Sequence, residues 1–166
     1  MALGIETYNG GVRSVGTFAT TLPVDLSGAS SVALPATGIA TGNLFTVSFI
    51  GQTTEAATDR VIFTATQACK VIAVSEVHAT AAGGASALQL TKDTGTTAPG
   101  AGTDLLTNNS NTGFDLNATA NTVQTGTLTA TAASLTLAAG DRLALDWANT
   151  IQSSAGINVT VTLVTV

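Results

Sequence analysis

The sequence predicts an all-β protein, an antiparallel β-sandwich or jelly roll with an extended N-terminal arm. From residue 44 onward, apolar and polar side chains alternate with a period of two, which places them on opposite faces of strands. Threonine, a β-branched residue that suits a pleated surface, is abundant, and Gly, Asn and Pro separate the alternating runs. No long run has a helical period, so alternating strand–helix units are not expected.

Residues 1–42 show no sustained period and contain Gly10-Gly11, Pro23 and Pro35. We therefore expect an extended arm over 1–42, with one or two short strands, and a β-sandwich domain over 43–166. A segment with little core of its own is ordered only when it lies on another surface. The alternative is a strand of the arm that pairs with the sandwich of its own chain.

Within the domain, each predicted strand rests on alternation or on a high content of β-branched residues. The strands are expected at 44–50, 60–66, 69–80, 87–91, 103–106, 122–131, 134–137, 142–147 and 157–166. Breakers place loops at 92–102 and 108–111 and a tight turn at 138–141. The inward faces give the expected core: Phe45, Val47, Phe49, Val61, Phe63, Leu143, Leu145, Trp147 and 157–163.

The charge balance excludes two classes of partner. Ten Asp and Glu face five Lys and Arg, for a net charge of −5. A nucleic-acid binder needs clustered cations, and an anionic membrane attracts them as well. The cations are scattered here, so we expect neither partner: Arg13, Arg60, Lys70, Lys92 and Arg142. The first residues lack the basic end of a secretory signal, so synthesis in the cytoplasm is expected.

Enzymatic chemistry is not expected. Cys69 is the only cysteine, which excludes an intrachain disulfide and a cysteine zinc site. His78 is the only histidine and lies nine residues from Cys69 along one predicted strand, beyond hydrogen-bond reach. We therefore assign no catalytic, cofactor-binding or metal-ligating residue. A glycosidase that uses two of the ten carboxylates is the enzyme alternative, and their scatter gives it no support.

Two groups of polar residues are candidates for a site. Glu76 and His78 are two apart and share a strand face, where they are a potential metal-ligand pair or pH-sensitive pair. Since further ligands are not evident, a solvent-facing or interface pair at the strand's end is the favoured interpretation. The second group is rich in side-chain oxygens, which calcium accepts as ligands, but it lacks the spacing of a calcium-binding loop. Asn and Asp side chains that hydrogen-bond to the backbone of their own loop explain these residues. That group is Asp104, Asn108, Asn109, Asn111, Asp115 and Asn117.

Several segments carry a resemblance to a known family. The stretches 59–71, 74–78, 96–105 and 137–145, in this order, resemble small structural proteins of tailed bacteriophages that decorate or cement the capsid. The likeness covers about residues 55–166 and leaves the arm unmatched. The segment Gly140–Leu145 also resembles the turn and strand of trimeric jelly rolls of the tumour-necrosis-factor and complement-head type.

The resemblance implies a structural virion protein. A homotrimer would sit on the outside of a phage head, bind the major capsid protein and stabilise the expanded lattice, with no cofactor and no reaction. We expect residues 1–42 to make the capsid or neighbour contact and the sandwich to form the trimer. The alternative is the receptor- or glycan-binding head of a phage fibre or spike, although no coiled-coil shaft is visible.

Overall fold

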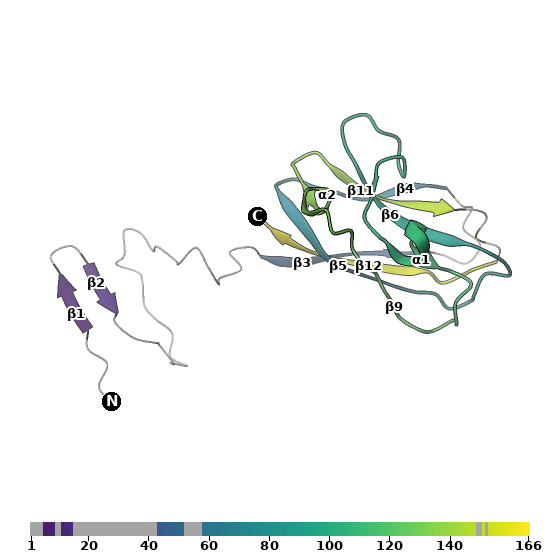
Figure 1. Ribbon diagram of the computed structural model, residues 1–166, viewed down its shortest axis with the longest axis horizontal. Coiled ribbons are helices and arrows are strands. Elements are labelled where there is room, and N and C mark those ends of the chain that lie inside the picture. Colours follow the sequence, from purple (N-terminus) through teal and green to yellow (C-terminus); the bar gives the residue numbers. More distant parts are fainter. Residues whose placement is uncertain (1–4, 9–10, 15–42, 52–57, 149–150, 152) are drawn as a thin grey trace. The chain divides into compact units, whose positions relative to one another are not determined.

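The computed structural model describes residues 5–8, 11–14, 43–51, 58–148, 151 and 153–166 (Figure 1). The chain divides into two compact units, Met1–Ile39 and Ala40–Val166. In the first unit, β1 (Ile5–Tyr8) and β2 (Gly11–Ser14) pair antiparallel as a separate two-stranded sheet. The rest of the expected arm lies outside the described residues.

The second unit contains two five-stranded antiparallel sheets that form two layers, which confirms the predicted all-β sandwich (Figure 1). Sheet I has the order β10-β5-β12-β3, and β9 also pairs with β5. Sheet II has the order β4-β11-β6-β7, and β8 also pairs with β6. The bounds are β3 Leu44–Ile50, β4 Arg60–Thr64, β5 Cys69–Val77, β6 Ala87–Asp93, β7 Thr103–Asp104, β8 Phe114–Asp115, β9 Gln124–Thr125, β10 Thr136–Leu137, β11 Arg142–Ala148 and β12 Asn158–Thr165.

The strand order is that of a jelly roll. Successive strands from β3 to β6 belong to sheets I and II in turn. β6 and β7 are both in sheet II, and from β10 to β12 successive strands again belong to sheets I and II in turn. Two single helical turns interrupt the strands, α1 (Asn108–Asn111) and α2 (Ala132–Leu135). None of the described helices has the length and apolar character of a membrane span.

The core lies between the sheets, where the alternation predicts it. β12 is the central strand of sheet I, and its Val159, Val161 and Leu163 are fully buried. Leu143 and Leu145 of β11 face them from sheet II and are equally buried. Each such side chain contributes about 1.5–3 kcal/mol through removal from water, so these alternating residues supply much of the stability of the sandwich.

A β-bulge in β4 corrects one predicted core residue. Leu143 lies opposite Phe63 and Ala144 lies opposite Val61, so Ile62 is an extra residue on β4. Val61, expected in the core, is 38% exposed, whereas Ile62 packs against the core. Strict alternation fails here because the extra residue turns the preceding side chain outward.

A second bulge lies in β5 and has larger consequences. Thr162 is opposite Ala73 and Leu163 is opposite Val71, which leaves Ile72 unpaired and 43% exposed. Before this point Cys69 and Val71 face the core, and after it Val74 does. The bulge therefore shifts inward-facing positions from odd to even residue numbers along β5.

The strand predicted over 122–131 is wrong over most of its length. Only Gln124–Thr125 form a strand, β9, and the amide of Gly126 then donates to the carbonyl of Val74 at 2.8 Å. Leu128 forms an isolated bridge with Leu106 and packs on the core. The chain leaves sheet I here, so the alternation of its threonines reflects exposure to water and not membership of one strand.

Candidate functional site

Glu76 and His78 are buried, so the interpretation of a solvent-facing or interface pair is wrong. They are 1% and 0% exposed and point into the sandwich, because the bulge at Ile72 reverses the alternation of β5. His78 Nδ1 lies 3.1 Å from Glu76 Oε1 and 3.3 Å from Oε2. His78 Nε2 lies 2.9 Å from the carbonyl oxygen of Ala118.

The pair holds the chain that follows β8. Gln124 Nε2 donates to Glu76 Oε2 at 2.8 Å and to the carbonyl of Asp115 at 2.8 Å. Gln124 Oε1 accepts from the amide of Asp115 at 3.2 Å, and the amide of Asn121 donates to the carbonyl of His78 at 2.7 Å. Gln124 is not identified by the sequence, because its place beside Glu76 depends on the pairing of β9 with β5.

The geometry fixes how many protons the pair carries. The carbonyl of Ala118 only accepts, so Nε2 of His78 bears a hydrogen. The contact between Nδ1 and the Glu76 carboxyl needs a second hydrogen, which makes either an imidazolium with a carboxylate or a neutral ring with a carboxylic acid. Burial raises the pKa of Glu76, although the charge and hydrogen bond of His78 and the hydrogen bond of Gln124 oppose this. The folded pair thus holds one proton more than a neutral imidazole and a carboxylate do.

Four of the six oxygen-rich loop residues, Asn108, Asn109, Asp115 and Asn117, form side-chain hydrogen bonds with nearby backbone. Asn108 Nδ2 donates to the carbonyl of Thr125 at 3.1 Å, and Asn109 Nδ2 donates to the carbonyl of Gly113 at 2.8 Å. Asp115 Oδ1 accepts from the amide of Asn117 at 2.9 Å. In the part of the chain that the structure describes, no three His, Cys, Asp or Glu side chains gather as a metal-binding group.

Two charged side chains of sheet II hold a loop over its outer surface. Asp93 is fully buried, and its two oxygens accept from Thr91 Oγ1 at 3.0 Å and from the amide of Gly100 at 3.2 Å. Arg142 Nη2 adds a bond to the carbonyl of Thr97 at 2.7 Å. The loop between β6 and β7, which carries Thr97 and Gly100, is therefore fixed by charged side chains of the strands below it.

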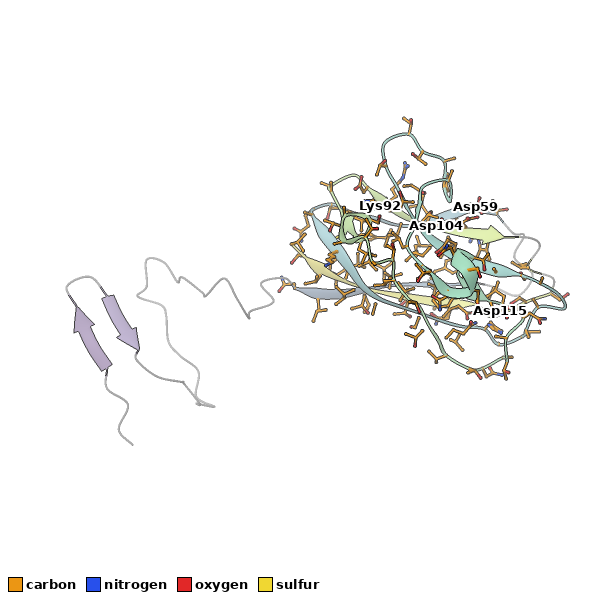
Figure 2. The ribbon with its side chains drawn as sticks, in the orientation of Figure 1. Asp59, Lys92, Asp104 and Asp115 are labelled. Carbon is orange, nitrogen blue, oxygen red and sulfur yellow. The ribbon has the colours of Figure 1, made fainter. Side chains whose placement is uncertain are left out.

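The pKa of Asp146 on β11 is raised, first by burial and then by the negative charges of Asp59, Asp104 and Asp93. Figure 2 labels four charged residues that lie on the strands of sheet II or directly before one of them: Asp59, Lys92, Asp104 and Asp115. Lys92 Nζ caps α2 by donating to the carbonyls of Ala133 and Thr136 at 2.9 and 3.1 Å. Lys92, like Asp93 and Arg142, thus holds a neighbouring segment in place through hydrogen bonds to its backbone.

A cavity of about 290 Å³ opens beside the first residues of β3 and β5. Phe45, Phe63 and Cys69 provide its apolar lining, and the exposed Asn43 and Gln67 are among its polar residues. Phe45 and Phe63 are in contact, with ring centroids 5.8 Å apart. Burial raises the pKa of the Cys69 thiol, and the charge of Asp141 raises it further, so the thiol stays protonated and unreactive at neutral pH.

The outer face of sheet I differs from the strands of sheet II in charge. Its side chains are hydroxyls, small aliphatics and one amide, with Lys70 at one end. We call this surface the threonine face; it consists of Thr46, Ser48, Ala73, Ser75, Val77, Asn158, Thr160, Thr162 and Val164, with Leu44 and Ile50 at its rim. The strands of sheet II, in contrast, carry Arg60, Lys92, Asp93, Asp104, Asp115, Arg142 and Asp146.

No protein-family model, curated protein or solved structure matches the chain. The fold therefore defines the class of protein: an all-β jelly-roll domain with a second, N-terminal unit.

Proposed function

We propose that this protein is a structural component of a tailed-bacteriophage head, which decorates the outside of the capsid as a homotrimer and stabilises the expanded lattice. The segments of residues 59–145 that resemble capsid-decoration proteins support the proposal. A ligand that binds only the expanded lattice stabilises that state against the pressure of packaged DNA. Many copies bind one capsid, so the total stabilisation is large even when each single contact is weak.

The observation that carries the proposal is the separate hairpin of the first unit. β1 and β2 are four residues each, pair with one another, and belong to neither sheet of the sandwich. A two-stranded hairpin is at best marginally stable by itself in water. Contact with a partner surface stabilises such a hairpin, and a capsid subunit is the partner that we propose.

Co-sedimentation with phage heads tests this function. The full chain is mixed with heads of the phage that carries its gene, in the expanded and the unexpanded form. We expect it to sediment with expanded heads alone. A variant that begins at Ala40 keeps both sheets and the buried core, and we expect it to fold and to lose most of the binding. Equal binding to both lattices, or to neither, refutes the proposed function.

A second candidate is the glycan-binding head of a fibre or spike, and the cavity beside Phe45 and Phe63 favours it. Half-buried phenyl rings next to exposed amides and hydroxyls offer an apolar surface with polar groups at its edge, as small-ligand sites do. Calorimetric titration with polysaccharide from the host surface separates the two functions. Saturable binding that Phe63→Ala abolishes, without binding to heads, supports the glycan-binding head.

A further inference from the structure

We propose that the threonine face is the surface through which copies of this chain associate. The inference rests on the proposed homotrimer and assigns its interface to the outer face of sheet I. Three features of the described residues lead to it: the distribution of charge between the sheets, the side chains of the face, and its extent.

Charge divides the sandwich into two unlike sides. Of the strands of sheet I, only β5 carries Asp, Glu, Lys or Arg residues, namely Lys70 and Glu76, and Glu76 points into the core. All other charged strand residues of the sandwich lie on sheet II. Surfaces that face water in soluble proteins usually intersperse charges of both signs, so a central sheet face without them indicates a surface suited to a partner.

The partner that this distribution fits is a second copy. A chain of net charge −5 repels its copies, and the repulsion is smallest when they meet through the uncharged side. The two sheets lie about 10 Å apart, so the carboxylates of sheet II stand farther from a neighbour on sheet I than they would from one on sheet II. A strongly charged partner would instead find no counter-charges on this face beyond Lys70.

The side chains suit contact with an identical molecule. Rows of residues run across three strands, for example Thr46, Thr162 and Ala73, or Ser48, Thr160 and Ser75. Ser48 Oγ and Thr160 Oγ1 lie 3.4 Å apart. A hydroxyl both donates and accepts, so hydroxyls from another copy find a partner without the removal of a charge from water.

The extent of the face is sufficient for the centre of an interface. β3 and β12 run for 7 and 8 residues. With about 3.4 Å per residue and about 4.8 Å between strands, the face measures roughly 400 Å² in projection. That is about half of the 800 Å² that a standard interface buries on each partner. The rim extends the contact with two exposed aliphatic side chains, Leu44 at 65% and Ile50 at 72%.

Light scattering and sedimentation of lysine variants test the assignment. Thr162→Lys places a charge at the centre of the face, and Thr46→Lys places one in the same row on the exposed side of β3. Thr96→Lys is the matched control, an exposed residue of the loop after β6. Each change lowers the net negative charge by one unit, so general repulsion weakens equally in all three. Only the location of the new charge distinguishes them.

We expect the unaltered chain and the control to have three times the mass of one chain, 16.4 kDa. We expect both face variants to dissociate to single chains, with association weaker by roughly a hundredfold or more, because an unpaired charge is buried. Far-ultraviolet circular dichroism confirms that the variants are folded, and Thr46→Lys decides the test if Thr162→Lys does not fold.

The outcomes separate this inference from the proposed function. Face variants that stay trimeric overturn the assignment of the interface and leave the decoration function standing. Face variants that remain trimeric but no longer sediment with expanded heads assign the face to the capsid, which also overturns it. Single chains for the unaltered protein overturn the inference and the homotrimer together. Dissociation by the face variants, with no head binding by any form, supports the inference and refutes the function.

Discussion

The buried pair of Glu76 and His78 predicts that the protein loses stability as the pH rises through neutrality. The folded pair holds one proton between Nδ1 and the carboxyl, and the bond from Nε2 to Ala118 requires the other ring hydrogen. One unit above the ordinary histidine pKa of about 6.5, a histidine in an unfolded chain is almost entirely neutral and a glutamate is ionised, so the unfolded pair lacks that proton. The folded state then binds more protons than the unfolded state.

The magnitude follows from this count. One proton of difference gives a slope of about 1.4 kcal/mol per pH unit, and the free energy of unfolding falls as the pH rises. The loss continues up to the pH at which the folded pair releases its proton. The raised pKa of Glu76 has the same sign, because a group whose pKa is raised by folding stabilises at low pH and loses that contribution at higher pH.

Urea denaturation at a series of pH values between 6.5 and 8 measures the effect. The series ends at pH 8 because the raised pKa of the Cys69 thiol adds a slope of the same sign at higher pH. The decisive variant is Glu76→Gln, whose amide nitrogen can donate to His78 Nδ1 while its oxygen accepts from Gln124. This network needs no titrating proton, so we expect the slope to vanish.

The control is Asp104→Asn, which removes an exposed carboxylate on sheet II and leaves the pair intact. We expect it to keep the slope of the unaltered protein. A constant free energy of unfolding from pH 6.5 to 8, or an unchanged slope in Glu76→Gln, refutes the proton count. Replacement of His78 by Phe leaves the carboxyl buried without its partner, and we expect a loss of about 3–5 kcal/mol at pH 7.

Three further predictions concern sheet II and its loops. Gln89→Ala removes a buried amide that bonds the amide and carbonyl of Leu106 at 3.0 Å each, and we expect a loss of about 3 kcal/mol in urea denaturation. Gly102→Ala places a Cβ against the Lys92 carbonyl, so we expect the free energy of unfolding to fall by at least about 2 kcal/mol. Gly95→Ala is the comparison: its Cβ contacts no atom and only the positive φ is unfavourable, so we expect a loss of about 1 kcal/mol. Asp146→Asn should raise the melting temperature slightly at pH 7 and not at pH 4, because the raised pKa shows that the ionised carboxyl is disfavoured. Equal melting shifts at both pH values contradict this explanation.

The all-β class, most strand positions and the core residues of β11 and β12 follow from the amino-acid pattern, whereas the buried residues of β5, β6 and β8 were not among the expected core. β3 spans Leu44–Ile50 as predicted, and the buried residues of β12 are the ones that the alternation selects. These features are local, because a strand with one buried face must repeat with a period of two. The scarcity of cations and the absence of a local nucleophile–base motif are likewise read directly from the chain.

Which side of a strand faces the core depends on its pairing with distant strands. Alternation shows that Glu76 and His78 share a face, and it gives no information on which face that is. The extra residue Ile72 reverses the pattern of β5, and it is an extra residue only with respect to the register with β12. The same holds for Ile62 against β11. Bulges arise from pairing between distant segments, so no local pattern contains them.

Strand order also came from the fold alone. The threonines of sheet I and the charged residues of sheet II alternate in the same way along the chain, yet the jelly-roll order gathers them on opposite sides of the sandwich. Gln124 reaches Glu76 only because β9 pairs with β5. Hydrophobic periodicity sets where each strand turns its side chains, whereas the assembly of strands distant in sequence sets which side chains become neighbours.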